Sequence, residues 1–213
     1  MGTSFCNRRE ADAVAFALDM LVAAGDVEVK DVGIITPYSA QVRLLQDVVG
    51  ASRRSSAAAA AAAVAKATDS SDSASGDEGR DERGDGQERE WAGRGHRRHT
   101  VDLPEIASVD GYQGREKEVI LLSAVRSNYG GRVGFLSDWR RLNVAITRAR
   151  RGVVVVGDPD TLERDPHWRA FLRWCDSHGA AMDESALYGA RGSGIGGGRG
   201  GDGDNEEGSR DVV

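Results

Sequence analysis

The residues in this sequence best suited to chemistry are arginines. Five of them, and no carboxylate, lie between Arg140 and Arg151. An arginine is permanently charged and offers a planar fork of donors, so arginines held by a packed element suit phosphate oxygens. An apolar stripe at helical spacing, formed by Leu142, Ala145, Ile146 and Ala149, runs through the same stretch. We therefore expect a buried cationic helix with Arg141 and Arg148 on one side, facing an anion. A solvated basic helix is the alternative.

A second polar segment, Asp110 to Lys117, joins two strand-like runs. Loops at strand ends are where open α/β sheets bind ligands. Gly114 would let the backbone approach a ligand closely, and Glu116 could accept hydrogen bonds from a sugar hydroxyl. Arg115 and Lys117 would balance the charge of Glu116. A tight polar turn with an internal ion pair explains the same residues equally well.

The elements that must position these side chains follow from apolar spacing. Helices are predicted over 8–24, 39–49 and 165–179, in addition to the cationic helix. Buried strands are predicted at 32–36, 106–109, 118–125 and 152–157. Ser137 or Asp138 would begin the cationic helix, and Asp165 with Pro166 the last one. Strands alternating with helices predict an α/β domain built on a mostly parallel sheet.

Two segments differ in composition from this folded part, which comprises residues 1–49 and 100–187. Residues 50–99 contain nine basic and nine acidic residues and a run of seven alanines. We predict a disordered, low-complexity insertion there, with the alanine run able to extend the preceding helix. Residues 188–213 form a Gly-rich tail that we also predict to be disordered.

Charge and cysteine content narrow the class of protein. The net charge is −6, with 4 basic and 7 acidic residues in 1–49 and 12 and 13 in 100–188. A cationic patch on a near-neutral body favours a specific phosphate site. No apolar run has membrane-spanning length, and the two cysteines and four histidines lack metal-ligand spacing. We expect a soluble cytoplasmic or nuclear protein with no membrane partner and no metal ligands of its own.

Taken together, the motifs resemble a known family. Asp110–Lys117, Gly134–Leu136 and Arg140–Arg150 closely resemble the second RecA-like domain of superfamily 1 helicases of the nonsense-transcript-regulator, senataxin and immunoglobulin mu-binding type. Gly33–Gln41 is similar to the preceding strand and helix, and Asp165–Trp168 to the closing helix. The resemblance covers roughly residues 1–49 and 100–185. It implies a RecA-like P-loop NTPase fold.

The resemblance also implies a nucleotide site for ATP with Mg²⁺ in a cleft between two such domains. It assigns Gln113, Gly114, Arg115 and Glu116 to the nucleotide, with Glu116 at the ribose. Arg141 is assigned to the nucleotide as well, on the same side of the expected helix as Arg148. Arg148 matches the arginine finger at the γ-phosphate, a role worth about 10³ to 10⁵ in rate. The magnesium ligands are expected on the first domain.

A single strand of RNA or DNA would cross the top of the fold. The residues expected to contact it, mainly through its backbone, are Thr36, Pro37, Tyr38, Ser108 and Asp110. Tyr38 and Tyr112 could stack on bases or could pack against the sheet edge; the sequence favours neither.

The sequence lacks three motifs of the family pattern. It contains no Gly-x-x-x-x-Gly-Lys-Ser/Thr loop, no Asp-Glu pair after a buried strand and no Gln-Tyr-Arg segment. We therefore expect the chain to need a first RecA-like domain, in cis or in trans, and to hydrolyse ATP poorly alone. Glu116 and Arg148 favour the C-terminal motor domain of an ATP-dependent RNA or DNA helicase. The missing phosphate loop favours a noncatalytic nucleic-acid-binding or adaptor module derived from one.

Overall fold

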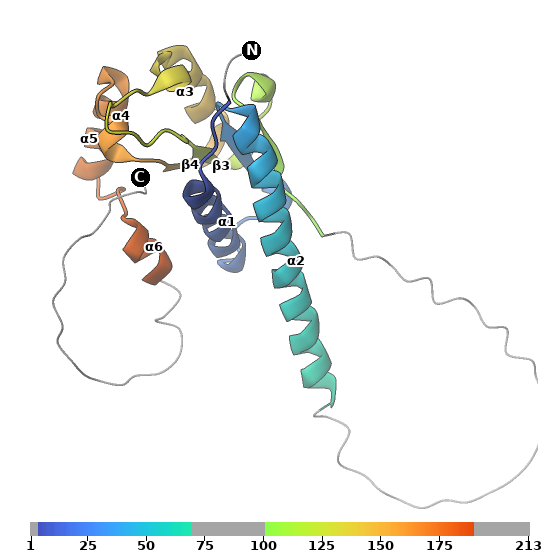
Figure 1. Ribbon diagram of the computed structural model, residues 1–213. Coiled ribbons are helices and arrows are strands. Elements are labelled where there is room, and N and C mark those ends of the chain that lie inside the picture. The colour runs from blue at the N-terminus through green and yellow to red at the C-terminus, as the bar shows by residue number, and fades with distance from the viewer. Residues whose placement is uncertain (1–3, 70–100, 190–213) are drawn as a thin grey trace, which may run out of the picture. The chain divides into compact units, whose positions relative to one another are not determined.

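The computed structural model describes residues 4–69 and 101–189, and its core is a four-stranded sheet (Figure 1). The strands are β1 (Val32–Thr36), β2 (Glu105–Ser108), β3 (Lys117–Ser123) and β4 (Ala149–Val156), in the order β2-β1-β3-β4. Every pair is parallel, with Ile34 opposite both Ile106 and Leu121. The predicted RecA-like α/β fold with a parallel sheet is confirmed.

Helices cover the sheet. They are α1 (Arg8–Ala23), α2 (Ser39–Asp69), α3 (Trp139–Ile146), α4 (Pro159–Leu162), α5 (Pro166–Ser177) and α6 (Glu184–Gly189). Three 3-10 turns, η1 (Val29–Asp31), η2 (Asp110–Tyr112) and η3 (Gly134–Ser137), lie between them. Asp138, one of the two predicted candidates, caps α3 by accepting from the Arg140 N–H, and Asp165 caps α5 as predicted, accepting from the His167 and Trp168 N–H groups. None of the helices in the described ranges is long and apolar enough to cross a membrane.

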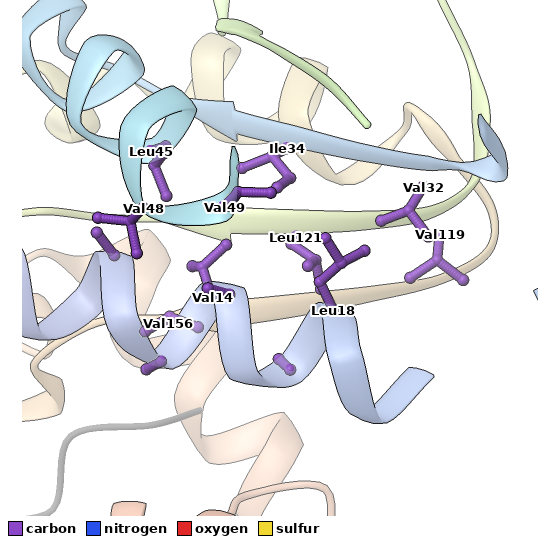
Figure 2. Packing of buried hydrophobic residues seen from close by; sticks show 14 of the residues in the cluster. Val14, Leu18, Val32, Ile34, Leu45, Val48, Val49, Val119, Leu121 and Val156 are labelled. Carbon is purple, nitrogen blue, oxygen red and sulfur yellow. The ribbon is translucent and has the colours of Figure 1, made fainter. Parts of the chain in front are cut away.

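Alternation along the strands sends side chains into two cores, one on each face of the sheet. Ile34 and Leu121 pack with Val14 and Leu18 of α1 and with Leu45 of α2 (Figure 2). On the other face, Ile35, Ile120 and Leu122 pack with Tyr112 and with residues of α3, α4 and α5, among them Leu142, Leu162 and Trp168. Burying one large apolar side chain stabilises a fold by about 1.5–3 kcal/mol, so both layers are firmly held.

The cationic helix is shorter than predicted. It ends at Ile146, Arg148 lies in the connection, and Arg150 and Arg151 belong to β4. Pairing with β3 decides this, because the Lys117 N–H donates to the Arg148 carbonyl (3.0 Å) and Lys117 lies opposite Ala149. Strand pairing prevails over the helical spacing of the segment, so Arg141 and Arg148 do not share a helical face.

The boundary predicted at residue 50 falls inside α2, which continues to Asp69. The alanine run Ala57–Ala63 extends the preceding helix, which was the alternative that the sequence offered, because alanine has the highest helix propensity. The remainder of the predicted insertion, 70–99, and of the predicted tail, 190–213, lies outside the described residues. The chain forms two compact units that divide at Ser52/Arg53 and at Val101/Asp102. The sites described below belong entirely to the unit that contains the sheet.

Candidate nucleotide and nucleic-acid site

The residues predicted to be functional lie at two opposite edges of the sheet. Arg115 and Glu116 precede β3 and Arg148 precedes β4, so all three lie at the amino edge, where the parallel strands begin. Thr36 ends β1 and Ser108 ends β2 at the carboxyl edge. The expectation that the whole Asp110–Lys117 turn would lie at a carboxyl strand end was wrong. A parallel connection must return to the opposite edge, so residues 109–116 cross the face of the sheet.

Arg148 is held at the amino edge by uncharged oxygens. Its Nε donates to the Val144 carbonyl (3.1 Å), Nη1 to the Arg115 carbonyl (3.5 Å) and Nη2 to the Thr147 hydroxyl (3.1 Å). The side chain is half-buried, and no carboxylate of the described residues forms an ion pair with it. A guanidinium fixed in this way keeps its positive charge uncompensated and attracts an anion.

Glu116 is paired with Arg150. Its Oε2 accepts from Arg150 Nε (3.2 Å), and Arg150 Nη1 also lies 3.7 Å from Glu118 Oε1. The expectation that Arg115 and Lys117 would balance Glu116 was wrong, because both lie beside Glu105. Both side chains of the Glu116–Arg150 pair are more than half exposed, and such pairs contribute about 0–1 kcal/mol. Replacing Arg150 by a ligand hydroxyl as the partner of Glu116 therefore costs little free energy.

Gly114 and Gln113 form the open part of the turn. Gly114 has φ = +83°, and a Cβ there would meet nothing within 4 Å. Its backbone is therefore open to close approach by a ligand, as the sequence suggested. Gln113 is exposed and lines a shallow hollow of about 200 Å³ with Asp110, Arg141 and Val144.

Arg141 is not grouped with Arg148. Its Nε contacts Asp110 Oδ1 (3.2 Å), and its guanidinium carbon lies 4.9 Å from the ring centroid of Phe135. The structure thus places this residue, predicted for the nucleotide, beside Asp110, which was predicted for the nucleic acid.

The carboxyl edge consists largely of buried polar and aromatic groups. Thr36 is fully buried, and its hydroxyl has no hydrogen-bond partner in the described part of the chain. Pro37 and Ser108 are half-buried, and the Ser108 hydroxyl accepts from the Gly111 N–H (3.1 Å). Of the predicted nucleic-acid residues, only Asp110 is freely exposed.

Both tyrosines are packed inside the protein. Tyr38 is 3% exposed and Tyr112 is fully buried. Tyr112 lies so close to Gly33 that a Cβ there would come within 2.1 Å of the tyrosine oxygen, so β1 needs glycine at this position. Burial raises the pKa of Tyr112 to about 12. Neither ring is open to a base in this structure, and both rings pack inside the protein.

Sequence reasoning missed a buried carboxylate next to this edge. Glu10 of α1 accepts from the Ser123 hydroxyl and from the Val125 N–H, both at 2.7 Å. Gln41 also donates to Ser123 (3.0 Å). Val125 has φ = +74°, which is rare for a β-branched residue, and Glu10 holds it there. An acidic residue in the first turn of a helix suggests only an interaction with the helix dipole, so nothing in the sequence pointed to this role.

The fit to a nucleotide can be judged from these groups. An uncompensated arginine, an open glycine and an exposed carboxylate suit a phosphate chain and a sugar. Among the residues that the structure describes, no three His, Cys, Asp or Glu side chains are placed to hold a metal ion.

A parallel sheet flanked by helices is the α/β architecture of a RecA-like domain. Comparison with known proteins identifies the family. Residues 1–160 match the family described as an AAA domain. The chain belongs to this family as a superfamily 1 helicase domain of the nonsense-transcript-regulator type.

The relatives are much longer proteins. The chain is 35% identical over 173 residues to the regulator of nonsense transcripts 1 homolog of Drosophila melanogaster, and 36% identical over 171 residues to the putative regulator of nonsense transcripts 1 of Takifugu rubripes. It is 29% identical over 191 residues to the putative ATP-dependent RNA helicase ECM32 of Saccharomyces cerevisiae. These matches cover 81%, 80% and 88% of this chain but only 11%, 12% and 16% of the relatives.

Proposed function

We propose that this chain is the C-terminal motor domain of an ATP-dependent RNA or DNA helicase. Its amino edge would close a cleft that holds ATP with Mg²⁺, and its carboxyl edge would contact a single strand. The observation that carries the proposal is the half-buried Arg148, whose guanidinium is held by three neutral oxygens and forms no ion pair with the described carboxylates.

Arg148 would act as the arginine finger. Phosphoryl transfer gathers negative charge on the equatorial oxygens of the γ-phosphate, and a preoriented guanidinium stabilises that charge. The Val144 carbonyl and the Thr147 hydroxyl already orient the Arg148 fork, so little reorganisation is needed. Bound ATP would supply the transferable phosphoryl group.

Glu116 and Gly114 would bind the rest of the nucleotide. Glu116 would accept from a ribose hydroxyl in place of Arg150, whose ion pair with it is exposed and weak. The open backbone at Gly114 admits the ligand. Gln113 and Arg115 would flank this position, with Arg115 kept in place by its ion pair with Glu105.

The phosphate loop and the magnesium ligands would come from a first RecA-like domain. The alternative, a noncatalytic nucleic-acid-binding module, gives no physical reason for an unpaired arginine beside an open glycine turn. It remains the outcome to expect if Arg148 proves unimportant for turnover.

Joining the full chain to the preceding part of the Drosophila relative would test the proposal. Nucleic-acid-stimulated ATP hydrolysis should appear in the chimera and be nearly absent from the chain alone. Arg148→Gln should lower kcat by about 10³-fold or more. Arg151→Gln is the matched control, because this exposed arginine of β4 donates to the backbone carbonyl of Asp26 (3.1 Å) and its replacement should have almost no effect.

Two results would contradict the proposal. One is that the Arg148→Gln and Arg151→Gln variants of the chimera hydrolyse ATP at the same rate. The other is robust ATP turnover by the chain alone that Arg148→Ala abolishes.

A further inference from the structure

Three aromatic rings with a guanidinium at each end lie in series along the carboxyl edge, and we call this series the aromatic row: Arg126, Phe5, Tyr38, Phe135 and Arg141. The Arg126 guanidinium carbon lies 4.2 Å from the ring centroid of Phe5, and that of Arg141 lies 4.9 Å from the centroid of Phe135. The Tyr38 centroid lies 5.5 Å from Phe5 and 5.6 Å from Phe135. The row draws on four separate segments of the chain and links the ends of β1 and β3.

Tyr38 holds the row together from inside. Its ring meets both phenylalanines nearly at right angles, 84° and 79°, an attractive arrangement of aromatic quadrupoles. Its hydroxyl lies against Gly134, where a Cβ would come within 2.6 Å. The outer rings are open by contrast, because Phe5 is 44% and Phe135 is 52% exposed.

The charge of the row is mainly positive. Arg126 donates from Nε to the Arg132 carbonyl (3.0 Å) and forms no ion pair with a carboxylate of the described segments. Arg141 forms an ion pair with the exposed Asp110 in addition to its contact with Phe135. Single exposed rings are common on protein surfaces, but these two each lie beside a guanidinium in one continuous series. Such a surface complements a polymer that alternates flat bases with phosphates.

We propose that Phe5 and Phe135 are base-stacking positions for a single-stranded nucleic acid and that Arg126 and Arg141 contact its phosphates. Tyr38 is then a positioning residue that fixes the two rings and does not itself touch the strand. This inference rests on the proposed function, in which the carboxyl edge carries the strand. Every nucleotide offers a base that can stack and a phosphate, so the row would bind a strand with little sequence preference.

Fluorescence anisotropy with the full chain tests the assignment, with three labelled strands of equal length: an oligouridine, an oligothymidine and an abasic deoxyribose phosphate strand. The chain should bind the strands with bases more tightly than the abasic one. Phe5→Leu and Phe135→Leu should each weaken binding to a strand with bases by about tenfold and leave abasic binding unchanged. Phe5→Tyr and Phe135→Tyr, which keep the ring, should bind like the parent.

Arg126→Gln should act differently from the ring variants. It should weaken binding to all three strands alike and reduce the slope of log affinity against log salt by about 0.7, because one phosphate contact is lost. Trp174→Leu is the matched control, since this exposed ring of α5 stacks on His178 outside the row and should leave every affinity unchanged. Thermal unfolding of each variant verifies that the fold is intact.

The possible failures are distinguishable. If the parent prefers strands with bases but both leucine variants keep that preference, the row is not the stacking site, although the proposed function stands. If the parent binds the abasic strand equally well, the edge recognises phosphate alone and the stacking assignment is overturned. If the parent binds no strand, the nucleic-acid part of the proposed function fails, and this inference with it.

Discussion

The two edges of the sheet satisfy their polar groups in opposite ways. At the amino edge, Glu116 and Arg150 form an exposed ion pair, and Arg148 is hydrogen-bonded to neutral oxygens. At the carboxyl edge, the buried Glu10 carboxylate is bonded to Ser123 and to the Val125 backbone. Exposed pairs exchange partners cheaply, whereas a buried network must stay complete. Substitutions at the amino edge should therefore change ligand binding, and those behind the carboxyl edge should change stability.

The largest expected difference in stability concerns two glutamates. Glu10→Ala should lower the free energy of unfolding by about 3 kcal/mol, because the Val125 N–H and the Ser123 hydroxyl lose their acceptor inside the protein. Glu116→Ala at the other edge should lower it by less than about 1 kcal/mol. Urea unfolding of both variants measures the difference. Equal losses would show that the buried and the exposed glutamate contribute equally to stability.

The next largest expected change in stability comes from Tyr112, which lies in the segment that connects the two edges. Burial raises its pKa to about 12, against about 10 in the unfolded chain. Between these pH values the unfolded state loses the proton first and binds fewer protons than the folded state, so stability falls as pH rises. The loss should approach about 2–3 kcal/mol by pH 12 and should be absent below about pH 9.

Tyr112→Phe isolates this contribution. The tyrosine hydroxyl is buried without a hydrogen-bond partner among the described residues, so its removal should be neutral or slightly stabilising at pH 8. The difference in unfolding free energy between variant and parent, followed from pH 8 to 11.5, should then grow in favour of the variant. A constant difference would show that this tyrosine titrates alike in both states.

Local patterns were enough to predict much of the fold. Short apolar, strand-like runs marked all four strands, although β2 is only half-buried. Asp165 marked the start of α5, and Asp138 was one of two candidates for the start of α3. The end of the cationic helix was not predictable in this way, because pairing with β3 decides it. That pairing joins Lys117 to residues more than thirty positions later in the chain.

The candidate site shows the same limit. The motifs selected Arg115, Glu116 and Arg148, which the fold brings to one edge, where the Arg148 guanidinium meets the Arg115 carbonyl. The partners of those residues were missed, since Glu116 pairs with Arg150 and Arg141 with Asp110 across separate segments. Phe135 lies in a motif that the sequence did display, but its contacts with Tyr38 and Arg141, which suggest a use for it, come from separate segments.

A smaller change in the free energy of unfolding is expected at Gly114, in the turn that leads to the amino edge. Alanine at φ = +83° is strained by about 1 kcal/mol even though a Cβ would meet no neighbour there. Gly114→Ala should therefore lower the free energy of unfolding by about that amount. Gly25→Ala is the matched control, because Gly25 has φ = +82° and equally open surroundings but lies far from the site in sequence. Chemical unfolding should give similar losses for both, and only Gly114→Ala should weaken ATP binding by the chimera with a phosphate-loop domain.

The smallest expected change in stability, and the sharpest functional contrast, comes from Glu116→Gln. The lost ion pair is exposed, so the free energy of unfolding should change by less than about 0.5 kcal/mol. In the chimera, KM for ATP should rise about fivefold with kcat nearly unchanged, because a ribose contact is made equally in the ground and transition states. Arg148→Gln should instead lower kcat with KM nearly unchanged, because the negative charge on the γ-phosphate that Arg148 would stabilise grows only during phosphoryl transfer. Parallel losses of kcat in both variants would mean that the two residues do not divide binding and catalysis between them.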